Sequence, residues 1–331
     1  MTILQNVPKI GFHKHMCPFP GSLHAALEYI GDPCDYDYLM GVTGAAFRRF
    51  FEKDDGGNID LLNLAPEPDR RAFWALNRDY SVAPPERDAM IAATRACIDR
   101  GVPVIAFGII GPPEAGLVTG YDRDGEVLYG YSYFQDTALP GYYEQTGWFE
   151  GISPQGEYSL IVIGDKRTTP PPAPRTVLAT SLAWAVDLAR APVRPERPQH
   201  ASGLAAHDAW AAALEVDADY PADKPDVLAT RTMVHGDQTC MLMERGYAAR
   251  FLRLMAPHAP EAAEELAAAA TLYDQVAGID GIWLWGENMG PEVGQALANR
   301  ETRLSIASAV RQARAQEAQA VEHLEAALRA M

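Results

Sequence analysis

The sequence predicts an α+β protein in which a domain with an antiparallel sheet precedes an all-helical domain. Short runs rich in β-branched and aromatic residues gather between residues 102 and 163, separated by Gly, Pro and Asp. A proline run follows at 167–175, and such a run interrupts both helices and central strands. Beyond it, alanine-rich stretches carry apolar residues at three- and four-residue steps, the helical spacing. We therefore expect domains at 1–166 and 176–331, joined by a linker at 167–175.

Four short runs make up the predicted sheet. Turn residues bound each run, and the runs are too short for helices of ordinary length. Asp122–Gly125 separates the second run from the third and predicts a hairpin turn. The runs are Val102–Phe107, Gly116–Tyr121, Glu126–Tyr133 and Tyr158–Ile163.

Helical periodicity predicts the remaining elements. In the first domain a helix starts at Ser22 and ends before Gly31, where a C-cap glycine belongs. Residues 45–58 are predicted as a hairpin or loop, and the acidic turn inside them lacks the regular ligand spacing of a calcium site. The other predicted helices are 35–40, 68–76, 85–100, 176–190, 203–214, 225–256, 259–277, 291–298 and 301–329.

The charge balance limits the classes of partner. The 331 residues include 28 Lys and Arg against 44 Asp and Glu, which gives a formal net charge of −16. Nucleic acids and anionic membranes both require a basic surface. We therefore expect a small-molecule or peptide substrate, no nucleic acid and no membrane, and leave the oligomeric state open.

Cysteine usage and targeting signals indicate a cytoplasmic protein. The four cysteines are far apart and form no CxxC pair, and the N-terminus lacks a basic region followed by an apolar run. No apolar stretch reaches transmembrane length. Glycine-rich phosphate motifs of the GxGxxG or GxxxxGK type are also missing, so we expect no cofactor.

Cys17 stands immediately ahead of the first predicted helix. The first amides of a helix have no intrahelical partner, and its dipole is positive at that end. A thiol in this position is biased toward thiolate, the nucleophilic form. The alternative is that Cys17 is a small buried apolar residue, as many unpaired cysteines are.

Two histidines precede Cys17 and are candidate bases. In an extended segment His13 and His15 lie on the same side of the chain as Cys17. The alternative is an edge that faces water. Together with Glu114 these residues include zinc and copper ligand types, but short alternation is a weak signal and we predict no metal site.

Other residues are predicted to contact substrate. Tyr131 and Tyr133 belong to a tyrosine-rich region that we expect to be partly wet, because each hydroxyl needs a partner. Trp283 and Trp285 can wall a pocket. His235 is a further candidate, its alternative being a hydrogen-bonded core histidine.

The order of these features resembles a known family. A cysteine before a helix, short helices, the strand Gly116–Asp122 and a further strand are similar to the papain-like fold of bacteriocin-leader peptidases. The order is more closely similar to the N-terminal domain of the butirosin biosynthesis protein H family of acyltransferases. The similarity covers roughly residues 8–165. It implies that Cys17 is the nucleophile and that Asp136, at the end of the further strand, orients a catalytic histidine. Gln135 beside it is an expected substrate contact.

The sequence departs from the family pattern at two positions. Counted back from Gly31 without a gap, the cysteine position falls on Pro18, so Cys17 fits with one extra residue. The histidine position holds Glu114. A carboxylate can accept a proton, but it forms no thiolate–imidazolium pair and raises the pKa of a nearby thiol. Either another base such as His15 serves, or the chemistry has been lost or replaced.

Two functions follow as hypotheses. The first is a cysteine-dependent acyltransferase or amidase-like enzyme that acts on a small acyl or peptide substrate in specialised metabolism, with Cys17, His15, Glu114 and Asp136 as catalytic candidates. The second is a papain-like protein that binds a small molecule, a peptide or a metal without covalent catalysis. Reactivity of the Cys17 thiol distinguishes them.

Overall fold

The computed structural model describes residues 1–11, 14–57, 59, 61–108, 114–133, 159–282, 284 and 291–331. The chain is about 58% helix and 13% strand, and the α+β class with an antiparallel sheet is confirmed. It divides into two compact units. The sheet unit comprises Met1–Leu39 and Asp69–Pro172, and the helical unit comprises Met40–Pro68 and Ala173–Met331.

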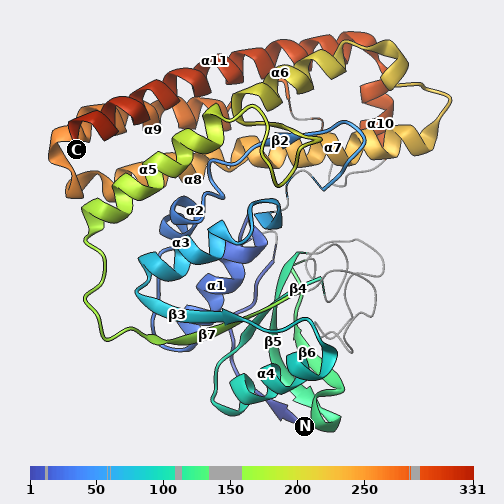
Figure 1. Ribbon diagram of the computed structural model, residues 1–331. Coiled ribbons are helices and arrows are strands. Elements are labelled where there is room, and N and C mark those ends of the chain that lie inside the picture. The colour runs from blue at the N-terminus through green and yellow to red at the C-terminus, as the bar shows by residue number, and fades with distance from the viewer. Residues whose placement is uncertain are drawn as a thin grey trace. The chain divides into compact units, whose positions relative to one another are not determined.

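Six strands form the sheet of the first unit (Figure 1). Their order is β1-β5-β4-β7-β3, with β6 also paired to β5, and all of these pairs are antiparallel. The four runs predicted from the sequence are β4 to β7, whereas β1 and β3 were not predicted. The bounds are β1 Thr2–Ile3, β3 Arg78–Val82, β4 Val104–Phe107, β5 Ala115–Asp122, β6 Val127–Tyr131 and β7 Leu160–Lys166.

Helices α1 (Pro18–Tyr29) and α4 (Arg87–Asp99) cover opposite faces of this sheet. Val104 and Ala106 of β4 share a buried cluster with residues of α4. Phe107 points to the other face, because side chains alternate along a strand, and its ring lies 5.8 Å from that of Phe19 in α1. The sheet is therefore buried on both sides, and α1 is fixed against its central strands.

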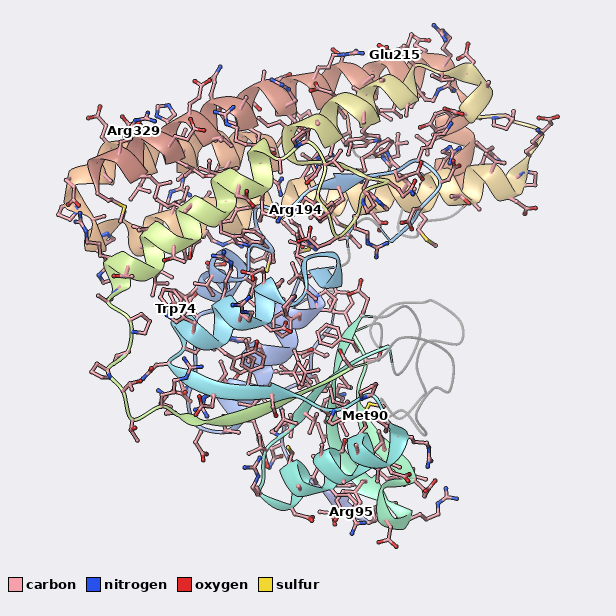
Figure 2. All side chains as sticks on the ribbon, viewed as in Figure 1. Trp74, Met90, Arg95, Arg194, Glu215 and Arg329 are labelled. Atoms are coloured by element: carbon pink, nitrogen blue, oxygen red, sulfur yellow. The ribbon has the colours of Figure 1, made fainter. Side chains whose placement is uncertain are left out.

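Helix α4 packs on the sheet through Met90 and Arg95 (Figure 2). Met90 is buried in the cluster between α4 and the sheet. Arg95 stands at the border of the helix, with its guanidinium 5.6 Å from the centre of the Tyr121 ring of β5. The long arginine side chain thus covers an aromatic ring while its charge stays in water.

The helical unit is built around the 31-residue helix α11, which packs along α5, α6 and α9 (Figure 1). The predicted helix 225–256 is two helices, because the chain bends at Glu244, where the Tyr247 N–H bonds the Glu244 carbonyl. The bounds are α5 Pro174–Arg190, α6 Gly203–Leu214, α7 Pro225–Met243, α8 Arg245–Met255, α9 Ala263–Ala277, α10 Pro291–Ala298 and α11 Arg300–Ala330.

Shorter elements complete the two units. The proline run separates β7 from α5, and the division between the units falls inside it, after Pro172. None of the helices in the described part of the chain has the length and apolarity needed to cross a bilayer. The shorter elements are α2 Tyr36–Val42, α3 Glu67–Ala75, β2 Phe50–Phe51, β8 Ala201–Ser202 and the 3₁₀ turns Leu61–Leu64, Arg123–Gly125, Asp217–Asp219, Ala256–His258 and Pro260–Ala262.

Residues 40–68 belong to the helical unit and not to the N-terminal domain predicted from the sequence. Strand β2 pairs with β8, with Phe50 opposite Ser202. The Phe47 ring meets Tyr273 of α9 edge-on at 5.7 Å. The predicted hairpin or loop is thus a strand and aromatic side chains that pack into the helical core.

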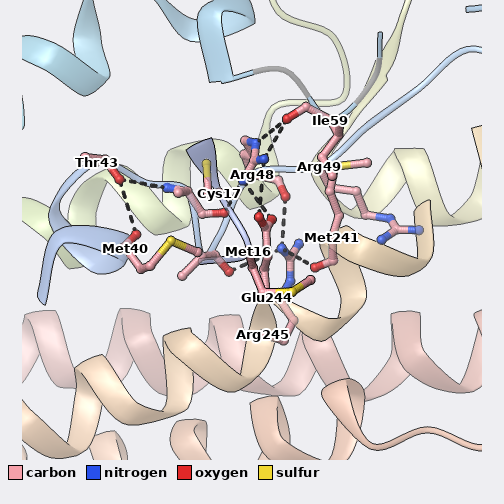
Figure 3. A network of polar contacts seen from close by, with 12 residues as sticks. Met16, Cys17, Met40, Thr43, Arg48, Arg49, Ile59, Met241, Glu244 and Arg245 are labelled. Carbon is pink, nitrogen blue, oxygen red and sulfur yellow. Dashed lines mark hydrogen bonds and ion pairs between the residues drawn. The ribbon is translucent and has the colours of Figure 1, made fainter. Parts of the chain in front are cut away.

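Buried ion pairs fasten this segment (Figure 3). Arg48 binds Glu244 at 2.7 Å, and the same guanidinium donates to the carbonyls of Ala45 and Ile59. Arg245 binds Glu317 of α11 through two N–H groups, at 2.7 and 3.1 Å, and donates to the carbonyls of Ala46 and Arg48. Both pairs are fully desolvated, so each charge depends on its partner.

Glu317 also accepts from His207. The two groups lie 3.0 Å apart, and the N–H of the neutral imidazole must be on Nε2, which faces the carboxylate. Burial alone raises the pKa of a carboxyl group, but Arg245 and His207 hold the pKa of Glu317 below its ordinary value of 4.5. Glu317 is thus the anionic centre of the helical core.

Replacement Glu317→Gln is expected to lower the free energy of unfolding by about 3–5 kcal/mol at pH 7, because it leaves Arg245 buried without a carboxylate. The loss should shrink as the pH falls below about 4.5, where the unfolded carboxyl binds a proton that the folded one resists. Urea unfolding across this pH range measures both effects. The exposed Glu322→Gln on the same helix is the control, and an equal effect of both variants would contradict the prediction.

Candidate functional site

Cys17 occupies the N-cap of α1 and is 1% exposed. Its backbone is extended (φ −116°, ψ 125°), and the helix begins at the next residue, Pro18, four residues before the predicted start. Proline suits the first helical turn because it needs no N–H partner there. The thiol therefore lies at the positive end of the helix, as the sequence analysis expected, while its Sγ atom makes no capping hydrogen bond.

Tyr36, the first residue of α2, holds the Cys17 backbone. The Cys17 N–H donates to the Tyr36 hydroxyl at 2.9 Å, and that hydroxyl lies 3.4 Å from the Cys17 carbonyl. The same carbonyl accepts the Gly21 N–H of α1 at 3.1 Å. The peptide groups on both sides of the Cys17 Cα are thus fixed, which leaves little freedom at the base of the thiol.

His15 is buried between α1 and α2. Its ring lies 4.9 Å from the Tyr36 ring and 5.5 Å from the His24 ring, and its Nδ1 has no hydrogen-bond partner among the described residues. Burial, with the nearby His24 and Lys14, lowers the pKa of His15 to about 4. At neutral pH the ring is uncharged and can accept a proton.

Backbone hydrogen bonds fix the residues just before Cys17. The N–H groups of Lys14 and His15 both donate to the Gly11 carbonyl at 3.0 Å. His15 lies against α1, with its side chain beside Gly21 and its ring beside Tyr36. His13 lies outside the described residues.

Gly21, which is not among the predicted site residues, makes room for His15. A Cβ atom on this residue would lie 2.7 Å from the Cβ and 2.8 Å from the Cγ of His15. Such distances are too short for carbon atoms, so the ring sits where only a glycine in α1 permits it. A glycine one turn into a helix, directly after Pro18-Phe-Pro, is the sequence signal for such a close approach.

Tyr133 supports the same backbone from the sheet side. It is 6% exposed, and its hydroxyl donates to the Met16 carbonyl at 2.9 Å. Tyr131 is half-buried, its ring faces Lys9 at 5.9 Å, and burial raises the pKa of its hydroxyl. The tyrosine face is partly exposed as expected, but Tyr133 itself is in the dry part and holds the residue before Cys17.

Glu114 directly precedes β5 and is half-buried. Its carbonyl accepts the Gly108 N–H at 3.3 Å. Helix α1 packs against β5, so the helix that starts after Cys17 and the strand that Glu114 precedes are neighbours. That the Glu114 carboxylate lies beside the thiol stays a prediction.

The remaining predicted residues divide into two groups. His235 is in α7 of the helical unit, where its Nε2 donates to the Ile282 carbonyl at 3.0 Å and its ring packs 5.7 Å from that of Trp210. It is therefore a hydrogen-bonded core histidine, the alternative considered above, and burial lowers its pKa to about 4. The others lie outside the described residues; these are Gln135, Asp136, Trp283 and Trp285.

The other cysteines lie in different environments. Cys34 is more exposed than Cys17, but burial together with Asp35 and Asp32 raises its pKa to about 12. Cys97 is part of the core between α4 and the sheet. Cys240 is buried in α7, where burial and the nearby Glu244 raise its pKa. Of the four cysteines, Cys17 is the one at a helix N-cap.

Within the described ranges, no group of three or more His, Cys, Asp and Glu side chains is arranged to hold a metal ion. No protein-family model matches the sequence, and no curated protein matches it significantly.

Replacement Gly21→Ala is expected to destabilise the protein by about 1–3 kcal/mol, because the new methyl group overlaps His15. It should also raise the pKa of His15, since the displaced ring meets more water. Thermal unfolding and NMR titration of the histidine signals measure the two effects.

The control is Gly246→Ala in α8, where the nearest atom to a new Cβ would be 3.6 Å away. This change should instead stabilise the protein by about 0.5–1 kcal/mol, because alanine favours a helix. A Gly21→Ala protein as stable as the Gly246→Ala protein would show that His15 does not rest against α1.

Replacement His15→Asn should weaken the pH dependence of stability. The unfolded chain binds a proton at His15 below pH 6.5, whereas the folded protein resists it down to about pH 4, so stability falls as the pH drops through this range. We expect the variant to lose roughly 1–2 kcal/mol less than the parent between pH 7 and pH 5. Urea unfolding measures it, with the exposed His258→Asn as control; identical pH profiles would refute the buried neutral state of His15.

Proposed function

We propose that the sheet unit is a papain-like domain in which Cys17 acts as the nucleophile of an acyl-transfer reaction. The observation that carries the proposal is the position of Cys17 at the N-cap of α1, on a backbone fixed by Tyr36, with a neutral imidazole two residues earlier. A nucleophilic thiol needs a favourable field, a defined direction and a proton acceptor. The N-cap position supplies the favourable field. The hydrogen bonds to Tyr36 define the direction, and His15 is the proton acceptor.

The reaction can be written with the residues of this chain. His15 accepts the Sγ proton as the sulfur attacks the carbonyl carbon of an acyl donor, and the protonated imidazole returns it to the leaving group. A thioester on Cys17 results. An amine or water then attacks this thioester, and His15 takes the proton of the attacking group. The protonated His15 passes this proton to the departing Cys17 sulfur, which restores the thiol. Aminolysis gives acyl transfer and hydrolysis gives amidase-like activity.

The low pKa of His15 defines the resting state. A base whose pKa is about 4 does not form an imidazolium at neutral pH, so the resting site holds a neutral imidazole. Proton transfer then accompanies attack on the carbonyl. This differs from the preformed thiolate–imidazolium pair that the resemblance implies, and it predicts a distinct pH profile.

The charge of the chain bears on the acceptor. A net charge of −16 repels anionic molecules and attracts cationic ones. We therefore propose that the acyl acceptor is an amine, and that the substrates are small molecules or peptides of specialised metabolism.

Two observations favour the second candidate function, a non-catalytic binding protein. The Cys17 side chain is 1% exposed, and Glu114 stands where the resembling family has its histidine. A buried thiol beside a carboxylate would be poorly ionised and inert. The reactivity of the thiol decides between the two candidates.

The test is acylation by p-nitrophenyl acetate, followed by intact-protein mass spectrometry and peptide mapping. We expect an acetyl thioester on Cys17, and none on Cys34, whose pKa of about 12 keeps it a thiol although it is more exposed. The rate should fall on the acid side with an apparent pKa near 4, the value of His15.

Variants assign the roles. Cys17→Ala should abolish acetylation, and His15→Asn should move the acid limb toward the pKa of a cysteine thiol, about 8.5. Glu114→Gln should leave the rate unchanged if His15 is the base, and abolish it if Glu114 is. A folded protein whose Cys17 remains unacetylated at every pH would support the binding function and exclude the enzyme.

A further inference from the structure

A second set of polar side chains in the helical unit keeps hydrogen-bonding atoms without partners. Each of its residues is at most 3% exposed. In the described part of the chain, nothing bonds the atoms Arg49 Nε and Nη2, Ser202 Oγ, His207 Nδ1, His235 Nδ1 and Gln238 Oε1. Leaving one such group buried and unpaired costs about 1–3 kcal/mol, more when it is charged. A ligand that paired several of them would remove this cost.

Trp210 of α6 lies beside two of these groups. The Arg49 guanidinium lies 5.2 Å from the centre of its ring, and the His235 ring lies 5.7 Å from it. Arg49 Nη1 donates to the Gln238 carbonyl at 3.4 Å, and the Gln238 amide donates to the Phe50 carbonyl at 2.8 Å. The unpaired groups come from the residue before β2, from β8 and from the helices α6 and α7.

The unpaired edge of Arg49 has a defined chemistry. Nε and Nη2 are on the same side of the guanidinium, so their two N–H groups are parallel and match the two oxygens of a carboxylate. Figure 3 shows the Arg49 guanidinium pointing away from the Arg48–Glu244 pair. Arg48 and Arg245 use their own forks on Glu244 and Glu317.

The other unpaired atoms include acceptors. His235 Nε2 faces a carbonyl and therefore carries the proton, so Nδ1 is bare. The side-chain Nε2 of Gln238 donates to the Phe50 carbonyl, so Gln238 Oε1 is left as an acceptor. A molecule that satisfies this set brings a carboxylate for Arg49 and a donor group for His235 or Gln238.

The charge balance points the same way. Three guanidinium groups, those of Arg48, Arg49 and Arg245, face two carboxylates, those of Glu244 and Glu317, and all five residues are at most 1% exposed. Burial and the nearby Arg245 lower the pKa of Arg49 to about 9, so it is still charged at neutral pH. An isolated buried charge costs several kcal/mol. One bound monoanion would neutralise the core.

We propose that the helical unit binds a small carboxylate that bears a hydroxyl or amino group next to it, with the carboxylate on the Arg49 fork and the neighbouring group donating to His235 Nδ1 or Gln238 Oε1. This site uses residues of the helical unit and is independent of any reaction at Cys17.

The test is the thermal unfolding midpoint in millimolar sodium glycolate, sodium acetate or sodium chloride at equal ionic strength, with saturation-transfer NMR of the two organic anions. Glycolate should raise the midpoint most, acetate less because it lacks the hydroxyl donor, and chloride least. Saturation should reach glycolate and acetate in the parent protein.

Two variants of Arg49 separate the effect of its paired N–H groups, the fork, from the effect of its charge. Arg49→Met should abolish the response to both carboxylates, and in chloride it should unfold no earlier than the parent, because it removes an uncompensated buried charge. Arg49→Lys keeps the charge without the fork and should bind glycolate at least about ten-fold more weakly. Arg253→Met, an exposed change in α8, is the control and should respond as the parent does.

Two results would overturn the proposal. One is a midpoint that rises in chloride as much as in glycolate, since this would mean that the core responds to ionic strength alone. The other is an unchanged glycolate response in both Arg49 variants, since the carboxylate would then bind elsewhere.

Discussion

The paired charges around Arg245 hold the helical unit together. Its guanidinium binds Glu317 on α11 and, at the same time, the carbonyls of Ala46 and Arg48, so one side chain joins the longest helix to residues synthesised some two hundred positions earlier. In a low-dielectric core such a group tolerates no missing partner. Residues 40–68 are therefore part of the helical core, and the position of β2 and of Arg49 follows from this attachment.

The surroundings of Cys17 obey a different constraint, that of a fixed backbone. Tyr36 binds its N–H, Gly21 binds its carbonyl, and Tyr133 binds the carbonyl of the preceding residue. Such bonding leaves the side chain as the part that can respond to a substrate. The residues around Cys17 and those around Arg49 are thus organised by different interactions. The first are organised around the fixed backbone of the proposed nucleophile, and the second around an unbalanced charge.

Much of the fold was predictable, and the failures have physical causes. Strands β4 to β7 are dense in β-branched and aromatic residues, whereas β3 was missed because Arg78 and Asp79 carry charges that pair with Asp32 and Arg167, far away in the sequence. The position of Cys17 at a helix N-cap was predictable because a helix start is a local signal. Tyr36 and Gly21 act through the packing of α1 and α2, so no local sequence pattern identifies their roles. Arg48 and Arg49 look like surface residues in the sequence, so their burial is not identified by a local pattern either.

The attachment of residues 40–68 also concerns protein synthesis. Arg48 and Glu244 are 196 residues apart, and at about 5–20 residues per second the ribosome needs roughly 10–40 s to make the second after the first. During this time Phe47, Phe50 and Phe51 lack the helices that later bury them. Charged residues that flank apolar runs lower the aggregation of a chain, and Arg48 and Arg49 stand between Phe47 and Phe50. The guanidinium groups that organise the finished core would therefore also keep this segment hydrated while the chain is being made.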